Sequence, residues 1–351
     1  MIASPAPRTD AAAAASVRRR LRALTTTAVV AAIFCIGFVW SVSIGTEPIG
    51  LGDIFHGMLL TSSSTDDVPQ LVVHLIRLPR ALLAAMVGGG LAVAGVVMQS
   101  ITRNPLGAPD ILGVSAGAAV AVALASTIWP GIASYGLIAL SFAGGALAAA
   151  LVFGLARFGR GGLSPVRLAL AGVTISILLF SLMQGILIIF SSDPSLFFFW
   201  LVGGVNYAEW HEVRTAAPWM LIGFAIAMLL AARLNVLALG DDVARGLGQN
   251  VGVTRFLGAI SVVLLAGAAV AVAGPVAFIG LIAPHIVRRL VGYNHFVVIP
   301  LSLVLGAALF LYADIASRFL IEGGETPSGI VTALVGAPLF ILLARREKVS
   351  S

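Results

Sequence analysis

Charged residues and cysteine are both scarce in this sequence of 351 residues. Only 10% of the residues are charged, against roughly a quarter in a soluble domain, while 59% are hydrophobic and the mean hydropathy is +1.06. This balance excludes a soluble enzyme. The single cysteine, Cys35, has no partner in the chain. An intrachain disulfide and a thiolate metal site are therefore excluded as well.

Lysine is almost absent, because Lys348 near the C-terminus is the only one. A phosphate-binding loop of the form G-x-x-x-x-G-K-[ST] needs a lysine directly after its last glycine, and no such loop precedes Lys348. Any ATP hydrolysis must therefore belong to another polypeptide. The five histidines are scattered over different segments, so we expect neither a metal site nor a catalytic cluster, and no cofactor in this chain.

Long apolar runs fill most of the sequence, and a membrane-spanning helix needs about 20 such residues. The runs are continuous, which excludes the alternating pattern of an outer-membrane barrel. The sequence therefore predicts an all-α, polytopic membrane protein with about ten transmembrane helices. The ten predicted segments are Ala23–Ile44, Ala81–Gln99, Ile111–Trp129, Leu137–Ala156, Leu168–Phe190, Ala216–Leu234, Leu257–Ala273, Val276–Val291, Phe296–Phe319 and Ile330–Ala344.

Two segments do not fit a simple crossing. The run Val276–Val291 is short for a span and follows Gly274-Pro275, a pair that breaks helices. The stretch Pro194–Val205 is apolar but too short to cross, so we expect a re-entrant or interfacial helix there. We expect residues 1–22 to be a disordered tail, 23–345 to be the transmembrane domain and 346–351 to be a C-terminal tail.

Basic residues indicate the orientation, because they resist translocation. With the N-terminus in the cytoplasm and ten crossings, the C-terminus is also cytoplasmic. Of the 21 basic residues, only Arg77, Arg80, Arg214 and Arg318 then face outside. Since the charges lie between apolar runs, we expect contact with membrane lipid and not with nucleic acid.

Glycines are frequent inside the apolar runs, as in Gly88-Gly89-Gly90 with Gly95, in Gly113 with Gly117, and in Gly144-Gly145. Lipid offers no hydrophobic drive for helices to associate, so small faces must let the backbones approach. Most of these glycines indicate a tightly packed bundle, with a gating role as the alternative.

Arginines on the expected outer side go against the orientation bias, which indicates that they have a function on that side. Arg77 and Arg80 are three residues apart around Pro79, so they share one face of a first helical turn. They predict a docking site for an acidic partner protein, with a lipid-phosphate anchor or an internal ion pair as alternatives. Arg318 has Asp314 one turn earlier, a helix salt bridge worth a few tenths of a kcal/mol if it is exposed.

The cytoplasmic loop of residues 235–254 predicts a short amphipathic helix. Asp241 and Asp242 can cap its start, and Gly246 or Gly248 can end it. Such a helix suits a groove on a cytoplasmic partner, although it could also be a plain connector resting on lipid headgroups. The candidate contact residues are Leu239, Gly240, Asp241, Asp242, Ala244, Arg245, Leu247 and Gly248.

Several motifs, in order from about residue 30 to the C-terminus, resemble the permeases of ABC importers for iron-siderophores and cobalamin (FecCD-type, type II importers). The motifs are Arg77-Leu-Pro-Arg80, Asn104-Pro-Leu-Gly-Ala-Pro-Asp-Ile-Leu-Gly113, Gly274-Pro-Val-Ala-Phe-Ile-Gly-Leu-Ile-Ala-Pro-His285, Glu325-Thr-Pro-Ser-Gly329 and Gly336-Ala-Pro-Leu-Phe340.

The resemblance implies a ten-helix permease that pairs with a second permease, identical or related, around a central pathway. Two ATPase subunits, which carry ATP and magnesium, would bind underneath, and an extracytoplasmic substrate-binding protein would meet Arg77, Arg80 and Arg318. The segment Leu237–Gly248 matches the family's coupling helix. The fifth span and Pro194–Val205 would lie near the pathway, and the tenth span would form the dimer contact. Candidate pathway residues are Met98, Gln99, Ser176, Gln184 and Phe190.

The expected function is ATP-driven import of a ferric siderophore across the cytoplasmic membrane by alternating access. A cobalamin or haem importer permease of the same family is the nearest alternative, because no residue separates these cargoes by physical argument. An ion-coupled secondary transporter is a more distant alternative, which genes for an ATPase and a binding protein beside this one would disfavour.

Overall fold

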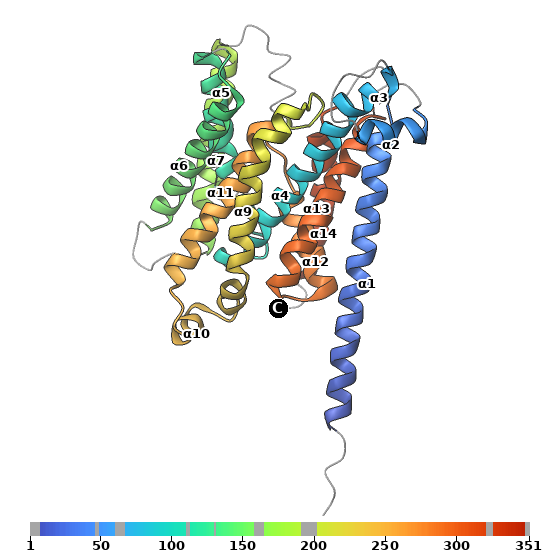
Figure 1. Cartoon of the computed structure of the whole chain (residues 1–351). Helices are drawn as coiled ribbons and strands as arrows, with labels where there is room; N and C mark the ends of the chain where they lie inside the picture. The colour runs from blue at the N-terminus through green and yellow to red at the C-terminus, as the bar shows by residue number, and fades with distance from the viewer. Residues whose placement is uncertain are drawn as a thin grey trace, which may run out of the picture.

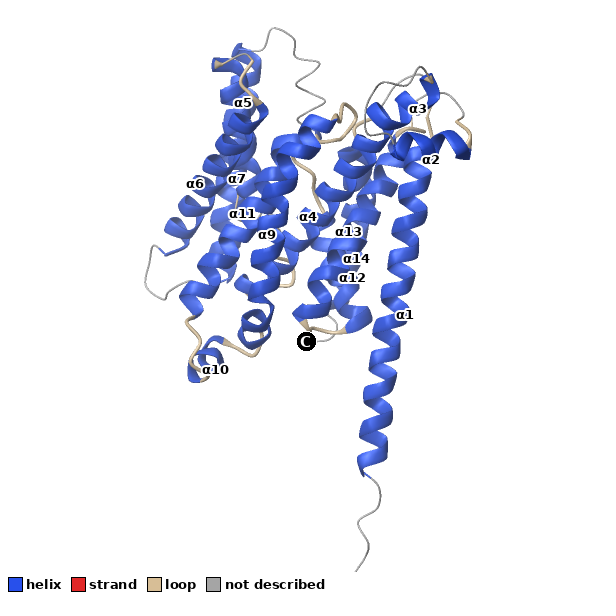
Figure 2. Cartoon of the chain, in the orientation of Figure 1, coloured by secondary structure: helices blue, strands red, loops and turns tan. Residues whose placement is uncertain are grey.

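The computed structural model describes residues 8–45, 49–59, 67–109, 113–129, 131–157, 165–190, 202–320 and 326–347. Every regular element in these residues is helical (Figure 2), which confirms the all-α fold. The longer helices form a bundle (Figure 1) and are α1 (Arg8–Ser43), α4 (Leu78–Thr102), α5 (Val114–Ile128), α6 (Ser134–Arg157), α7 (Pro165–Phe190), α9 (Trp210–Leu237), α11 (Val251–Ala273), α12 (Ile279–Val291), α13 (His295–Ser317) and α14 (Ser328–Glu347). The short ones are α2 (Leu51–Leu59), α3 (Val68–Val72), the π-helix η1 (Val73–Arg77) and α10 (Asp241–Gly246).

These longer helices match the ten predicted segments one for one. Among the described residues, six helices are long and apolar enough to cross a membrane, and the apolar parts of α5, α7 and α14 are shorter. With 13 residues, α12 is only about 20 Å long, less than the roughly 30 Å of a hydrocarbon core. The chain is therefore a multi-pass membrane protein in which α12 is a partial span.

The centre of the bundle is α4, which packs against α9, α11, α12 and α13. In the most apolar window of Val68–Thr102, 83% of the residues are buried, against 11% in Ala23–Ser43 of α1. The two segments are almost equally hydrophobic, with mean hydropathies of 2.2 and 2.1, so they differ in position and not in composition: α4 is surrounded by helices, and α1 stands at the edge (Figure 1).

Glycines bring the helices of this bundle into backbone contact, as expected. A Cβ on Gly88 would strike the carbonyl of Gly306 in α13, and one on Gly95 would strike the carbonyl of Gly280 in α12. The small-residue faces of α4 therefore set the distance to two neighbours.

Two predicted segment boundaries differ in their outcome: the one at residue 22 is wrong, and the one at Pro194 lies outside the described residues. The helix α1 begins at Arg8, so residues 8–22 are helical and not part of a disordered tail. Most of the predicted Pro194–Val205 helix, residues 194–201, lies outside the described residues.

The predicted break at Gly274-Pro275 is confirmed, since α11 ends at Ala273 and α12 begins at Ile279. The N–H of Gly204 donates to the carbonyl of Ala273 (2.8 Å), and the N–H of Gly329 donates to the carbonyl of Gly203 (2.9 Å). The non-helical residues Gly203 and Gly204 thus bond to the end of α11 and the first turn of α14, so this irregular backbone is satisfied inside the protein, which is the condition for it within a membrane.

Candidate functional site

The predicted outer arginines lie at the end of the bundle that carries α2 and α3. There the chain passes from α3 through the π-helix η1 into α4, and Arg77 is the last residue of η1. A π-turn widens the helix by one residue and is frequent at functional sites. The arginine is 5% exposed, so its guanidinium points into the protein.

The carboxylate of Asp314 joins two of these arginines and is itself fully buried. From α4, Arg80 donates through Nε and Nη2 at 3.0–3.2 Å. From the end of α13, Arg318 donates through Nη2 at 2.7 Å. The expected i,i+4 pair exists, but it is buried and shared, so the small energy of an exposed pair does not apply to it.

The same arginines bind the last turn of α1. Arg77 Nη1 donates to the carbonyl of Ser43 at 2.7 Å, and Arg318 Nη1 donates to the carbonyls of Ser41 and Ile44 at 2.9 and 3.0 Å. The final carbonyls of a helix lack intrahelical partners and carry partial negative charge. The arginine cluster (Arg77, Arg80, Arg318 and Asp314) therefore caps α1 and ties it to α4 and α13.

The three arginines predicted to dock a binding protein thus lie together. Their guanidinium groups, however, contact residues of the same chain. The internal ion pair, which the sequence left open, is the arrangement observed for Arg80 and Arg318. A docking role stays a prediction. The fourth expected outer arginine, Arg214, is exposed and lies 5.9 Å from the ring centroid of Trp210.

At the opposite end of the bundle, α10 forms the predicted short helix between α9 and α11 (Figure 1). Its N-cap is Gly240, with φ 119° and no side-chain cap, so the expectation that Asp241 or Asp242 caps the helix is wrong. Its C-terminus is as predicted for Gly248, which has φ 79°. The N–H of Gly248 donates to Arg245 and that of Gln249 to Ala244, both at 2.9 Å, which is a Schellman motif.

The residues around α10 divide between two faces. Asp241 accepts from Arg255 Nη2 at 3.0 Å, which fixes α10 to α11. Leu239, Val243 and Leu247, at intervals of four, are 65%, 47% and 67% exposed. Ala244 is buried beneath them. These three residues form an exposed apolar row along α10 and its two flanks, and α10 is held in place by Asp241. A groove on a partner protein could bind such a row.

The predicted pathway residues do not form one surface. Met98 and Gln99 are buried between helices of the same chain in this conformation, and their place on the pathway stays a prediction. In α7, Ser176 is half-buried and Gln184 is exposed. Phe190 ends α7, and its side chain lies outside the described residues. Because α4 is apolar on all sides, its sequence does not show which of its faces other helices cover.

Gln99 belongs to a polar network between α4 and α12. Arg288 Nη1 donates to Gln99 Oε1, and Gln99 Nε2 donates to the carbonyl of Gly280 at 3.4 Å. Beside it, His295 lies 2.7 Å from Ser100 Oγ through Nε2 and 2.8 Å from Asn235 Oδ1 through Nδ1. This network links α4 to the end of α9, just before α10. Sequence reasoning missed it.

Comparison with known proteins now decides the family. A model of the FecCD transport family matches residues 33–346, nearly the whole chain. The chain belongs to the FecCD transport family. This confirms the resemblance drawn from the motifs and makes the protein a transport permease.

Relatives of this FecCD permease are similar over most of their length. The iron(3+)-hydroxamate import system permease protein FhuB of Bacillus subtilis is 42% identical, over 90% of this chain and 82% of that protein. The Fe(3+)-citrate import system permease protein YfmD of the same organism is 40% identical, over 90% and 93%. The ferric enterobactin transport system permease protein FepD of Escherichia coli is 37% identical, over 90% and 93%.

A solved structure confirms the fold of this FecCD permease. An inward-facing metal-chelate type ABC transporter matches with a TM-score of 0.77 and 33% identity. The match covers 91% of this chain and 98% of that one.

Proposed function

We propose that this chain is the membrane-spanning permease subunit of an ATP-driven importer that carries a ferric siderophore across the cytoplasmic membrane by alternating access. The observation that carries the proposal is the similarity, over about nine-tenths of the chain, to permeases named for ferric hydroxamate, citrate and enterobactin import.

The sequence supports a separate ATPase, because a chain whose only lysine is Lys348 has no lysine for a phosphate-binding loop. The exposed row of Leu239, Val243 and Leu247 supports α10 as the element that meets this ATPase. In this role α10 is the coupling helix: the ATPase pushes on α10, and α10 moves α9 and α11, between which it lies. ATP can drive the change only by binding one arrangement of the complex better than the other.

The orientation follows the basic residues. We place the N-terminus, α10 and the end of α14 in the cytoplasm, because this leaves only four basic residues outside. The arginine cluster then lies at the outer rim. An acidic binding protein would approach it from outside, where a net positive end steers association.

Transport in reconstituted vesicles tests the proposal. The genes next to this one are first searched for an ATPase and a substrate-binding protein. These proteins are combined with the chain, and labelled ferric siderophore, haem and cobalamin are offered in parallel. We expect ATP-dependent accumulation of the ferric siderophore that stops when ATP or the binding protein is omitted. Accumulation of cobalamin or haem alone would reassign the cargo. Uptake by the isolated chain, driven by a proton or sodium gradient, would refute the proposal.

A further inference from the structure

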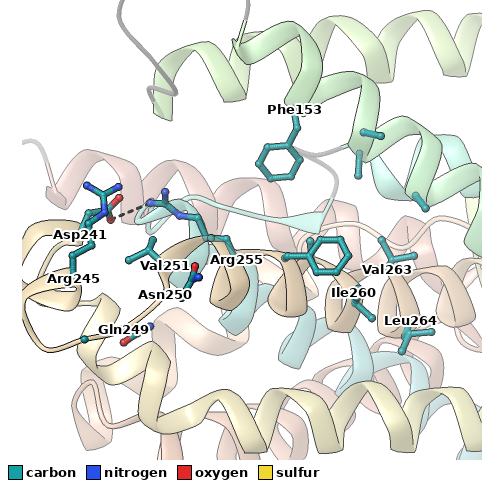
Figure 3. A pocket seen from close by; sticks show the side chains of 17 residues that line it. Phe153, Asp241, Arg245, Gln249, Asn250, Val251, Arg255, Ile260, Val263 and Leu264 are labelled. Carbon is teal, nitrogen blue, oxygen red and sulfur yellow. Dashed lines mark hydrogen bonds and ion pairs between the residues drawn. The ribbon is translucent and has the colours of Figure 1, made fainter.

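A cavity of about 1140 Å³ opens between α6, α11 and the coupling helix α10 (Figure 3). It lies away from the arginine cluster, and neither the polar network of Gln99 nor the exposed leucines of α10 line it. Its role is therefore not explained by the proposed transport contacts.

The cavity has a polar end and an apolar end. Arg245, Asn250 and Arg255 line the part beside α10, whereas Phe153, Ile260 and Leu264 line the part between α6 and α11. Figure 3 shows Asp241 and Arg245 at one end of the cavity and Ile260 and Leu264 at the other, with the Phe153 ring between them, reaching from α6 toward Arg255 on α11. The polarity thus changes along the helix axes, in the direction in which a bilayer changes from headgroups to hydrocarbon.

The length of the cavity fits one leaflet. Its lining on α11 runs from Val251 to Leu264, a rise of about 20 Å. Half of a hydrocarbon core is about 15 Å, which leaves a few ångströms for a headgroup. On α6 the lining runs from Phe153 back to Ala146, a rise of about 10 Å, so α6 contributes a wall about half as long as that of α11.

Cationic side chains gather at the polar end. Arg245 is largely exposed, and Arg255 keeps about a third of its side-chain surface while it pairs with Asp241. Basic pockets between transmembrane helices near a membrane surface bind anionic lipid headgroups.

The two faces of α10 keep this site separate from the ATPase contact. Asp241, Arg245 and Gly248, at i, i+4 and i+7, line the cavity, whereas Leu239, Val243 and Leu247 do not. Within α10 (Asp241–Gly246), Val243 is two residues from both Asp241 and Arg245, so at 3.6 residues per turn it points to nearly the opposite side of the helix. One face can therefore contact a lipid while the other contacts a protein.

We propose that this cavity binds one anionic phospholipid, with its phosphate at Arg245 and Arg255 and an acyl chain along Phe153, Ile260 and Leu264. A lipid in this place connects α6 to α10 and α11 and thereby supports the coupling helix from behind. The assignment to the cytoplasmic leaflet rests on the proposed function, but lipid binding itself requires only that the chain be in a membrane.

Native mass spectrometry of the full chain tests this inference. The protein is delipidated in mild detergent and titrated with phosphatidylglycerol or phosphatidylcholine. We expect one phosphatidylglycerol to be retained in preference to phosphatidylcholine. Arg245→Gln removes one headgroup contact and should weaken phosphatidylglycerol binding by about fivefold. Ala150→Trp, at an exposed lining position of α6, should abolish most of the retention by filling the acyl groove.

Matched variants separate the site from general effects. Arg289→Gln removes an exposed arginine at the end of α12 outside the cavity, and Leu151→Trp adds the same ring beside Ala150 but outside the lining. Both should retain lipid like the unaltered chain. Equal retention of the two lipids, or unchanged retention in Ala150→Trp, would overturn the inference, and neither result would bear on transport by the proposed complex.

Discussion

At the scale of single residues, Asp314 is the group on which the most contacts depend. Its carboxylate is buried with two guanidinium groups around it. A buried charge is tolerated only when partners and hydrogen bonds replace water. The neighbouring Arg77 and Arg318 extend the same cluster to the carbonyls that end α1. Removal of one arginine should therefore disturb both the carboxylate and the contact between helices.

Arg80→Ala should lower the free energy of unfolding by about 3–5 kcal/mol, because Asp314 would lose one of its two arginines while remaining buried. Unfolding of the purified protein, titrated with a denaturing detergent, measures this loss. Arg214→Ala, at an exposed arginine on the same side of the protein, should change stability by no more than about 0.5 kcal/mol. Arg80→Lys, which keeps a positive charge beside Asp314, should recover part of the loss. Equal stability of Arg80→Ala and the unaltered chain would show that the pair is dispensable.

At the scale of elements, the contacts of α4 and the exposed face of α10 carry the architecture and the proposed coupling. Gly95 brings α4 against the backbone of α12, and Gly88 brings it against α13. The helix α10, in contrast, keeps an apolar row uncovered. The first feature concerns packing inside the chain, and the second concerns a partner.

Gly95→Ala should destabilise the protein by about 1–3 kcal/mol, since the new methyl group overpacks a contact between two backbones. The same detergent titration measures it. Gly154→Ala is the control, because a Cβ at Gly154 in α6 meets nothing within 4 Å. The control should be neutral or slightly stabilising, as alanine favours a helix over glycine. A loss of similar size in both variants would contradict the close-contact explanation.

Val243→Asp should reduce stimulation of the partner ATPase and its co-purification with the chain. The substitution places a charge in the middle of the exposed apolar row, where it would lose water on contact with a groove. Stability in detergent should not change, because Val243 is about half exposed. Leu290→Asp, which places the same charge on a similarly exposed apolar residue at the end of α12, is the matched control. Normal ATPase coupling in Val243→Asp would exclude this face of α10 as the contact.

At the scale of the whole molecule, the two ends of the bundle differ in kind. One end holds the buried arginine cluster and α2 and α3, and the other holds α10 (Figure 1). An importer needs such asymmetry, because cargo arrives at one face and ATP is consumed at the other. The membrane orientation is therefore the property on which the assignment of both ends depends.

Labelling with a membrane-impermeant maleimide tests this orientation. The free and exposed Cys35 is first replaced by serine, and single cysteines are introduced as Tyr207→Cys and Gly246→Cys, both at exposed positions. In intact cells, Tyr207→Cys should react and Gly246→Cys should react only after permeabilisation. The reverse pattern would invert the topology that the basic residues predict.

Much of the fold could be predicted because continuous apolar runs mark helices in a membrane directly. The break after Ala273 was also visible, because Gly274-Pro275 leaves a local signal. The pairing of Arg80 with Asp314 joins residues 234 positions apart and leaves no such signal. The burial of Met98 and Gln99 was equally hidden, since a helix that is apolar all round does not show which face its neighbours cover.

The helix α1 contains 36 residues and is therefore about 54 Å long. A hydrocarbon core of about 30 Å accommodates the 21 residues of Ala23–Ser43. The remaining turns continue past the lipid on the side of α10, where they stand clear of the bundle (Figure 1). A fluorescent dye attached near residue 10 would therefore lie outside the membrane, at a fixed distance from its surface. Energy transfer from this dye to a second dye on the partner ATPase could then follow the binding of the ATPase without changing any residue of the bundle.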